Sequence, residues 1–429
     1  MDAADKLKTV AEHMVLEAAE DYDCKPHSAP SLAPCGISPG ELQRLTRARA
    51  LSSPAPVSPV LPPPAGSPPT SRVTLSEAKK SALGVTYAAM PGGRRIALLK
   101  TLLTSACERD CYYCPFRAGR DFRRVSFKPD EMARAFLDLQ NARIAEGMFL
   151  SSGILGGGAR IQDQLIATAE ILRLKLGYRG YLHLKIMPGA EQAQVERAMQ
   201  LADRLSINLE APNSARLARL APHKTFTEEL VQPLRWVDEI RRSQPARLGW
   251  NGRWPSTTTQ FVVGGAGETD LELLSTTESL HRQTRLARAY FSAFHPVAGT
   301  PLENQPAENP WREFRLYQSS FLLRDYGFEV EDLQFSPDGN LPLEVDPKVA
   351  WAQVNLAGTP VEINRAGRQA LLRVPGIGPK TADAVLAARR RGRLSDLREL
   401  KALGVILKRA APYLLVDGRQ AARQLSLFG

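Results

Sequence analysis

Between about residues 95 and 330, short apolar runs rich in β-branched and aromatic residues alternate with stretches of helical pattern. Such alternation predicts repeated βα units whose strands form a parallel sheet, so the expected fold class is α/β. Six strands are expected, at residues 98–104, 148–152, 181–187, 204–210, 259–264 and 290–294.

Strict alternation of apolar and polar residues marks the third and fourth of these runs. In 181–187 and 204–210, leucine and isoleucine alternate with Tyr, His, Lys, Ser, Asn and Glu. Strands buried under helices on both faces usually read as continuous apolar runs. The alternation therefore favours a barrel with a helix-covered outer face and a polar lumen. A half-solvated antiparallel sheet is the alternative, although helical stretches lie between nearly all the strands.

Two helices show how local signals set the expected boundaries. Pro129 begins a helix, with Asp130 and Glu131 in the first turn, and Gly147 is expected to stop it. A second, amphipathic helix is expected at residues 5–22, ahead of a segment rich in Pro, Ser and Ala. Such a segment buries too little apolar surface to order itself, so residues 26–73 are interpreted as a disordered linker.

The composition is that of a globular protein. The chain has 429 residues, 43% of them apolar and 24% charged, enough for two or three domains. It has no apolar run of about 18 residues and no signal-peptide core, so a cytoplasmic protein is expected.

Three of the five cysteines lie within eight residues, as Cys107-x-x-x-Cys111-x-x-Cys114, after the first expected strand. This clustering favours a metal site in a reducing compartment over disulfides. Structural zinc normally needs four ligands, and no second cysteine pair or Cys/His pair follows. Three thiolates suit a [4Fe–4S] cluster that leaves one iron open, with zinc or structural thiols as the alternatives. Cys24 and Cys35 are interpreted as structural or free thiols.

This spacing at the end of a first barrel strand resembles the radical S-adenosylmethionine (SAM) superfamily. The resemblance implies that SAM binds the open iron and that its reductive cleavage gives a 5′-deoxyadenosyl radical, which takes hydrogen from a substrate. It further implies SAM contacts by Tyr113 and by Ser151, Ser152 and Gly153, where many members have Gly-Gly-Glu. On the same grounds Lys185, Asn208, Glu210, Val263 and Gly265 are candidate SAM contacts, with pocket-wall packing as the alternative.

The positive charge is concentrated at the C-terminal end. Residues 361–429 hold 14 Lys or Arg and 5 Asp or Glu, and thus +9 of the net charge of +11. A concentrated positive charge is typical of nucleic-acid binding, although membranes and acidic proteins also attract it.

Within that region, residues 371–382 read LLRVPGIGPKTA and resemble a helix-hairpin-helix motif, with a weaker second half near Gly404. Its glycines allow a tight turn and bring amide groups to a phosphate at the next helix. Ile377 is the expected packing plug. The DNA-binding candidates are Gly376, Ile377, Gly378, Lys380, Thr381 and Gly404. A protein-interaction module is the alternative, and Arg389–Arg393 are interpreted as cations at a helix C-terminus.

The final residues, Gln424-Leu425-Ser426-Leu427-Phe428, resemble the peptide by which bacterial DNA-processing proteins bind the replication sliding clamp. Gln424, Leu425, Leu427 and Phe428 are the candidate clamp-binding residues.

Residues 80–416 as a whole resemble radical SAM proteins associated with DNA modification or repair, often linked to a uracil-DNA-glycosylase-like partner. The stretches that carry this resemblance are LLKTLLTSACERDCYYC, GMFLSSGI, GYLHLKIMPGA, LYQSSFLLRDYGF, PVEINRA and LLRVPGIGPKTA. The expected architecture is a partial (βα)6 barrel followed by a small all-α helix-hairpin-helix domain.

The predicted activity is radical-based modification or repair of a DNA base or sugar by a nucleoid-associated enzyme. A radical SAM enzyme acting on RNA and a non-catalytic iron–sulfur scaffold on DNA are the alternatives, and no catalytic residue is assigned. The expected domains are a helix at 1–25, the linker at 26–73, the barrel at 80–335, a connecting segment at 336–359, the DNA-binding domain at 360–416 and a flexible tail at 417–429.

Overall fold

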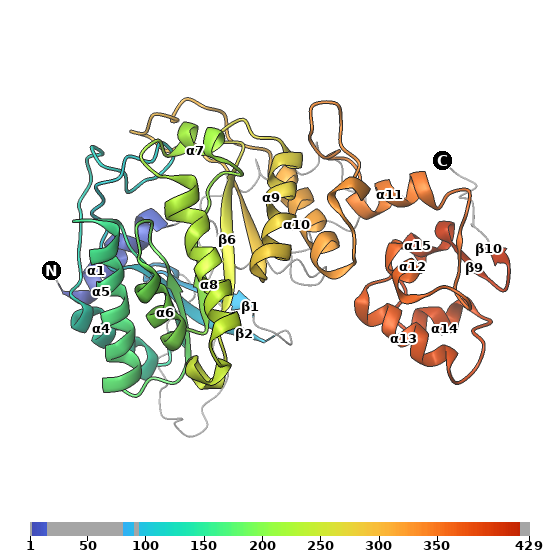
Figure 1. The fold of residues 1–429 in the computed structure, drawn as a ribbon, viewed down its shortest axis with the longest axis horizontal. Coiled ribbons are helices and arrows are strands. Elements are labelled where there is room, and N and C mark those ends of the chain that lie inside the picture. Colours follow the sequence, from blue (N-terminus) through green and yellow to red (C-terminus); the bar gives the residue numbers. More distant parts are fainter. Residues whose placement is uncertain (1, 15–79, 90–93, 421–429) are drawn as a thin grey trace, which may run out of the picture. The chain divides into compact units, whose positions relative to one another are not determined.

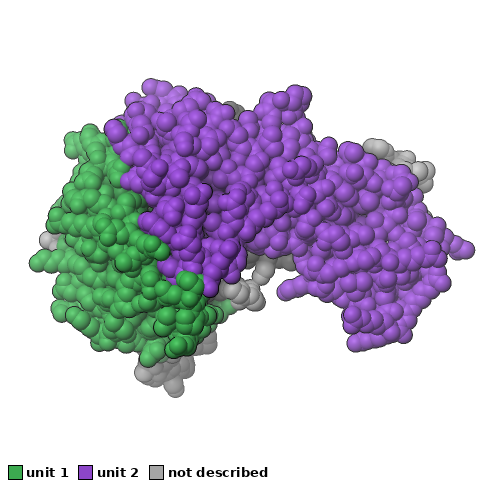
Figure 2. Space-filling view, viewed as in Figure 1, with its two compact units in different colours: residues 1–110, 114–206, 243–255 green, residues 111–113, 207–242, 256–429 purple. Residues whose placement is uncertain are grey.

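The structure is a computed structural model that describes residues 2–14, 80–89 and 94–420. The expected linker, Cys24, Cys35 and the clamp-like peptide lie outside the described residues. The chain divides into two compact units, coloured separately in Figure 2. One comprises residues 1–110, 114–206 and 243–255, and the other comprises residues 111–113, 207–242 and 256–429.

A seven-stranded sheet with strand order β1-β2-β3-β4-β5-β6-β7 forms the centre of the fold (Figure 1). The strands are β1 (Val85–Ala89), β2 (Arg95–Leu102), β3 (Gly147–Ser151), β4 (Tyr181–Lys185), β5 (Arg204–Ser206), β6 (Ser256–Val263) and β7 (Arg288–Ala293). β2 to β5 pair in parallel, as do β6 and β7, whereas β1 runs antiparallel to β2. The order confirms the α/β partial barrel and all six expected strands; the antiparallel strand β1 was not expected.

Helices follow the strands in the expected βα order. They are α4 (Pro129–Asn141), α5 (Gly158–Glu170), α6 (Gln192–Leu201), α7 (Ser214–Leu220), α8 (Gln232–Ser243), α9 (Asp270–Thr284) and α10 (Pro310–Asp325). Within the described residues, π-helical turns lie at η2 (Ile171–Lys175) and η3 (Phe226–Val231), and 3-10 turns lie at η4 (Ala246–Leu248), η5 (Trp250–Gly252) and η6 (Val330–Asp332).

The helix that begins at Pro129 has the expected start and an earlier end. The Lys128 amide donates to Glu131, which satisfies a free helix-start group. α4 ends at Asn141, and Arg143 then adopts a positive φ of 59°. Gly147 is instead the first residue of β3, where a Cβ would lie 3.1 Å from Tyr181 O. The expectation that Gly147 stops this helix is therefore wrong.

The N-terminal helix α1 (Ala3–Met14) packs its apolar side on the first unit. Leu7, Val10 and Met14 are buried, and Lys6 Nζ lies 2.6 Å from Glu131 Oε1 on α4. The described part of the expected 5–22 helix therefore belongs to the folded core.

The alternating strands bury both kinds of side chain. Leu182 and Leu184 are fully buried, and His183 between them is only 1% exposed. Beyond β5 the chain continues beside β6, because the Ile207 amide donates to Thr258 O and the Glu210 amide to Gln260 O. Ser206, Asn208 and Glu210 are also buried, as a polar interior requires.

The C-terminal module is mainly helical. It contains α11 (Pro347–Asn355), α12 (Arg368–Arg373), α13 (Pro379–Arg389), α14 (Leu397–Ala402), α15 (Leu407–Ala410), the turn η7 (Ala411–Tyr413) and the short strands β8 (Val361–Glu362), β9 (Leu414–Val416) and β10 (Arg419–Gln420). β8, β9 and β10 form a small sheet. The β9–β10 hairpin turns at Asp417 and Gly418, both with positive φ, so β10 lies within the first residues of the expected 417–429 tail.

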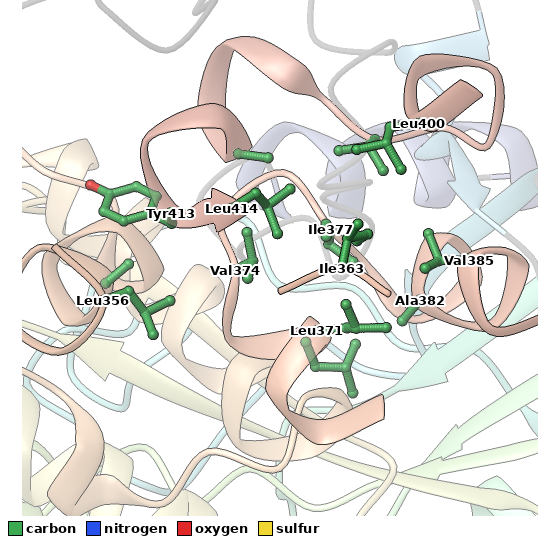
Figure 3. Packing of buried hydrophobic residues seen from close by; sticks show 14 of the residues in the cluster. Leu356, Ile363, Leu371, Val374, Ile377, Ala382, Val385, Leu400, Tyr413 and Leu414 are labelled. Atoms are coloured by element: carbon green, nitrogen blue, oxygen red, sulfur yellow. The ribbon is translucent and has the colours of Figure 1, made fainter. Parts of the chain in front are cut away.

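A separate hydrophobic core holds this module together (Figure 3). Ile363, Leu371, Val374 and Ile377 are at most 1% exposed within it. The core also takes in Ala352 and Leu356 at α11, so it extends into the segment expected to be only a connection. No helix in the described ranges is long and apolar enough to cross a lipid bilayer.

Candidate functional site

The three clustered cysteines lie in the long loop between β2 and α4. None of the three forms a disulfide with another described residue; Cys111 is buried and the other two are half-buried. The Ile154 amide points to Cys107 Sγ and the Phe116 amide to Cys114 Sγ, each at 3.4 Å. Backbone N–H groups directed at sulfur stabilise thiolates, as in iron–sulfur sites.

Arg124 organises the same loop from within. Its guanidinium donates to the carbonyl oxygens of Ser105 (2.8 Å), Phe116 (2.6 Å) and Arg117 (2.6 Å) and lies over the ring of Phe122. Burial lowers the pKa of Arg124, and the negative charge of the Cys107 and Cys114 thiolates opposes that shift. Arg124 thus places a positive charge close to these two sulfurs.

The side chains of the cysteine loop offer sulfur donors for a metal cluster. No group of three or more His, Cys, Asp or Glu side chains is brought together as a metal site within the described part of the chain. Cys107 and Cys114 belong to the first unit and Cys111 to the second. Thiols are nevertheless the soft donor type that iron–sulfur clusters take, and backbone amides directed at Cys107 and Cys114 and the nearby Arg124 suit such a cluster.

The segment after β3 lies against the end of β2. Ser152 Oγ accepts from the Thr104 amide at 3.3 Å, and the Gly153 amide donates to Thr104 O at 2.7 Å. A Cβ on Gly153 would lie 2.3 Å from Ala106 O, so only glycine allows this approach. Ser151 is buried beside them. The Ser152 hydroxyl therefore has a structural partner in addition to its expected SAM role.

Glu108 ties the cysteine loop to the glycines after β3. Its carboxylate accepts from the amides of Gly156 and Gly157 at 2.9 and 3.1 Å. Further along the loop, the Tyr112 amide donates to Leu220 O at 2.7 Å. Tyr113, the candidate adenine neighbour, is half-buried.

Asn208 and Glu210, two of the expected SAM contacts, lie on the segment that follows β5. Asn208 is 7% exposed, and its Oδ1 has no hydrogen-bond partner in the part of the chain that the structure describes. An unsatisfied buried oxygen is costly, so this atom suits a ligand hydroxyl or amine. Lys185 is half-buried at the end of β4.

Glu210 has a protein partner that the sequence did not reveal. It adopts a positive φ of 64°, and its Oε1 lies 3.2 Å from Lys224 Nζ. Both side chains are less than 10% exposed, so each charge compensates the other. The Lys224 amide donates to Ala221 O just after α7, and only the fold brings this lysine to Glu210.

The glycine-rich loop after β6 closes on its own carboxylate. Glu268 accepts from the amides of Gly264 and Ala266, and Gln305 Nε2 donates to Gly264 O at 2.7 Å. Val263 is fully buried in β6, and a Cβ on Gly265 would lie 2.8 Å from Leu220 Cδ2. These bonds fix the backbone at the candidate residues Val263 and Gly265.

Arg312 of α10 holds the glycine-rich loop after β6 in place through hydrogen bonds. Its guanidinium donates to Glu268 O (2.7 Å), Asp270 Oδ1 (2.7 Å) and Glu308 Oε2 (2.6 Å). Burial raises the pKa of Glu268 and of Asp270, while Arg312 acts in the opposite direction on both. Arg312 stands more than 40 residues from Asp270 in the chain, and no local pattern pointed to it.

The predicted hairpin in the C-terminal module joins α12 and α13. Gly376 has φ of 84°, and a Cβ there would lie 2.6 Å from Ile406 O. Its own carbonyl accepts from the Ile406 amide at 3.0 Å. Gly378 is the N-cap residue of α13 with φ of −102°, so a need for positive φ applies to Gly376 alone. Ile377 is 1% exposed in the core of Figure 3.

The start of α13 presents the groups that a phosphate needs. Pro379 occupies the first turn, and Lys380 is exposed beside it with no side-chain partner among the described residues. Thr381 Oγ1 donates to Gly404 O at 3.3 Å, which connects this hairpin to the weaker second one between α14 and α15. Gly404 has φ of 91°.

A connection from α11 fixes the apex of the first hairpin. Lys348 Nζ donates to Ile377 O at 2.6 Å and lies over the ring of Tyr326. Asp346 pairs with Arg409 at 2.8 Å in the same region. The carbonyl of the turn is thus satisfied from within the protein.

Two family models match the chain. The model of the radical SAM superfamily matches residues 101–280, and that of the helix-hairpin-helix motif matches residues 359–388. The first range contains the cysteine loop and most of the sheet, and the second contains the Gly376 hairpin. Members of the radical SAM superfamily use a [4Fe–4S] cluster and SAM, which they cleave reductively. No curated protein matches the chain.

Several solved structures are similar to the chain at low identity. Methylornithine synthase (PylB) is 16% identical with a TM-score of 0.43, over 54% of this chain and 64% of that one. The hydrogenase maturase HydG from Carboxydothermus hydrogenoformans is 12% identical with a TM-score of 0.41, over 53% and 51%. A radical SAM methyltransferase from Sphaerobacter thermophilus is 14% identical with a TM-score of 0.37, over 68% and 92%.

The chain thus spans less than two thirds of the first of these structures. Similarity at this level supports no assignment, and the family models cover residues 101–280 and 359–388. The chain contains a radical SAM domain followed by a helix-hairpin-helix motif.

Proposed function

We propose that this chain is a radical SAM enzyme that modifies or repairs a base or sugar of DNA, and that its C-terminal module holds it on the nucleic acid. The observation that carries the choice of DNA is the Gly376 hairpin at the start of α13, with exposed Lys380 beside it. Helix starts of this kind bind phosphate through free amides and the helix dipole. Contacts to phosphate position a protein without reading sequence.

In this proposal Cys107, Cys111 and Cys114 hold the [4Fe–4S] cluster. When bound, the cluster supplies the electron that cleaves SAM to a 5′-deoxyadenosyl radical. The amides of Ile154 and Phe116 stabilise two of the thiolates, and Arg124 balances their charge. The buried Asn208 oxygen would accept a hydrogen bond from SAM. The backbone at Gly264, which Glu268 holds in place, would lie beside the bound SAM.

The substrate nucleotide must leave the duplex to react. A base stacked inside a helix exposes too little of itself to a recessed site, so a flipped or single-stranded target is expected. Association with the nucleoid would follow from this binding.

The experiment that tests the proposal is an anaerobic assay of the full chain with reconstituted cluster, SAM and a strong reductant. Duplex DNA, single-stranded DNA and transfer RNA are compared, 5′-deoxyadenosine is quantified, and nucleosides are analysed by mass spectrometry. DNA should stimulate 5′-deoxyadenosine formation and yield a DNA nucleoside of altered mass. Stimulation by RNA alone would replace DNA with RNA as substrate, and no 5′-deoxyadenosine under any condition would favour a scaffold.

We extend the proposal to two partners. The peptide at residues 424–428 binds the sliding clamp, and a uracil-DNA-glycosylase-like protein acts beside this chain on the same DNA. Deletion of the last six residues should abolish co-elution with the clamp and leave duplex binding unchanged. Co-elution of the truncated chain would dismiss the clamp peptide.

A further inference from the structure

An open hollow lies at the end of α13 opposite the Gly376 hairpin. Its volume is about 730 Å³. It is lined by Asn364, Arg365, Leu386, Arg389, Arg390, Arg391, Gly392 and Arg393. Five of these eight residues are arginines and none is acidic, so the lining is strongly positive.

Two of the arginines are held by the protein. Arg389 donates to Ala366 O, and Arg393 pairs with Asp417. The other three, Arg365, Arg390 and Arg391, are exposed, and their guanidinium groups have no hydrogen bond or ion pair with any described residue. Three guanidinium groups are therefore available to an external anion.

Compensation of the α13 dipole does not account for this arrangement. A helix C-terminus is stabilised by cations within about its last turn, and Arg389 already lies there. Arg365 belongs to a different segment, the turn after β8, yet it lines the same hollow. Arg365, Arg390 and Arg391 come from two segments around one depression and have no acidic partner among the described residues, which is typical of an anion site.

The hollow is built on a fixed frame. Asn364 Nδ2 donates to Leu394 O at 2.7 Å and to Asp417 Oδ1 at 2.8 Å, and the Leu394 amide donates back to Asn364 Oδ1 at 2.9 Å. These bonds join the turn that carries Arg365 to the loop that carries Arg390 and Arg391. Both segments thus keep their positions before a ligand arrives, which lowers the entropic cost of binding.

We infer that this arginine hollow is a second binding site for the phosphate backbone of DNA, separate from the Gly376 hairpin. α13 has 11 residues, so the two sites lie about 16 Å apart along the helix. That span exceeds the spacing of neighbouring phosphates on one strand, so each site contacts a different part of the same DNA. Guanidinium groups bind phosphate through paired hydrogen bonds, which makes arginine the suited residue. The inference rests on the proposed binding to DNA and adds a contact that the hairpin alone does not provide.

Salt titration of duplex binding by the full chain tests the inference. The variant Arg390→Gln/Arg391→Gln is compared with Arg235→Gln/Arg247→Gln, which removes two exposed charges of the barrel part of the chain. Each lost phosphate contact lowers the slope of log K against log salt by about 0.9. The hollow variant should bind roughly tenfold more weakly, with a slope smaller by about 1 to 2. The control should keep the wild-type slope.

A third variant, Arg365→Gln, guards against a local folding effect. It lies outside the α13 loop, and its slope should fall by about 1 with an unchanged unfolding temperature. Wild-type slopes in both hollow variants would overturn the inference while leaving DNA binding by the hairpin intact. A loss confined to structured RNA would overturn it as well. No duplex binding by the wild-type chain would overturn both the inference and the proposed function.

Discussion

Glu210 and Lys224 in the barrel part of the chain are both nearly inaccessible and pair with each other, whereas Lys380 and Arg390 in the C-terminal module are exposed and have no side-chain partner among the described residues. The difference follows from the ligand that each region is proposed to take. A buried charge must be compensated within the protein because desolvation is costly. A polyanion, in contrast, needs charges that remain in water until it arrives. Substitutions should therefore cost stability in the first region and affinity in the second.

The largest effect is expected at the cysteine loop. Cys111→Ala removes one of three proposed iron ligands, so 5′-deoxyadenosine formation should fall to background and the iron content should drop. Anaerobic reconstitution followed by iron and product analysis measures both. Cys24→Ala/Cys35→Ala is the matched control and should retain both properties. Full activity of Cys111→Ala would remove the proposed cluster ligation.

The buried pair Glu210–Lys224 provides the next effect. Lys224→Met leaves the Glu210 carboxylate buried without its cation, which should lower the free energy of unfolding by about 3 kcal/mol. Urea denaturation measures the loss. Glu210→Gln/Lys224→Met removes both charges and should recover most of it. If Lys224→Met were as stable as the wild type, the Glu210 carboxylate would not need Lys224 as its partner.

Lys348 makes the stability of the module depend on pH. Burial lowers the pKa of Lys348 from 10.5 to about 7, Asp346 opposes the shift and Arg409 adds to it. Between these pH values the unfolded chain binds a proton that the folded chain does not, so the free energy of unfolding rises with pH from about 7 towards 10. For one titrating group, the free energy of unfolding can change by at most about 1.4 kcal/mol per pH unit.

Urea denaturation at pH 7 and pH 9 measures this dependence. Between the two values Lys348→Met should gain about 2 kcal/mol less than the wild type. Lys401→Met, which replaces an exposed lysine of α14, should follow the wild type. Identical gains in all three proteins would show that Lys348 keeps its proton in the folded state.

The smallest effect is expected at the hairpin. Gly376→Ala places a Cβ at positive φ and 2.6 Å from Ile406 O. This change should lower the free energy of unfolding by about 1 kcal/mol and weaken duplex binding several-fold. Gly358→Ala is the control because nothing lies within 4 Å of its Cβ position. Fluorescence anisotropy with a labelled duplex compares the two, and SAM cleavage should be unchanged in both. Unaltered binding by Gly376→Ala would contradict the phosphate role.

The sequence predicted what local spacing determines. The cysteine motif and the Gly376 hairpin each occupy a dozen residues or fewer, so chain order alone keeps their groups near one another. Six strands were recognised from apolar runs. The antiparallel strand β1 was missed because Val85–Ala89, with the sequence VTYAA, has no long apolar run.

Partners distant in the chain could not be predicted. Arg312 of α10 contacts Asp270, 42 residues away in the chain, and Lys224 pairs with Glu210, 14 residues away. Nothing in the residues around Arg312 or Lys224 distinguishes them from solvent-exposed cations. The burial of Ala352, inside the segment expected to connect the two domains, likewise depends on a core formed further along the chain.

Helix α11 determines where a fragment containing the C-terminal module could begin and still fold. Ala352 and Leu356 complete its core, and Lys348 satisfies the carbonyl of the hairpin. A fragment cut at residue 360 would carry the whole motif and lose this support, together with the partner of Arg409 at Asp346. Grafting the module onto another protein therefore requires a junction upstream of Asp346.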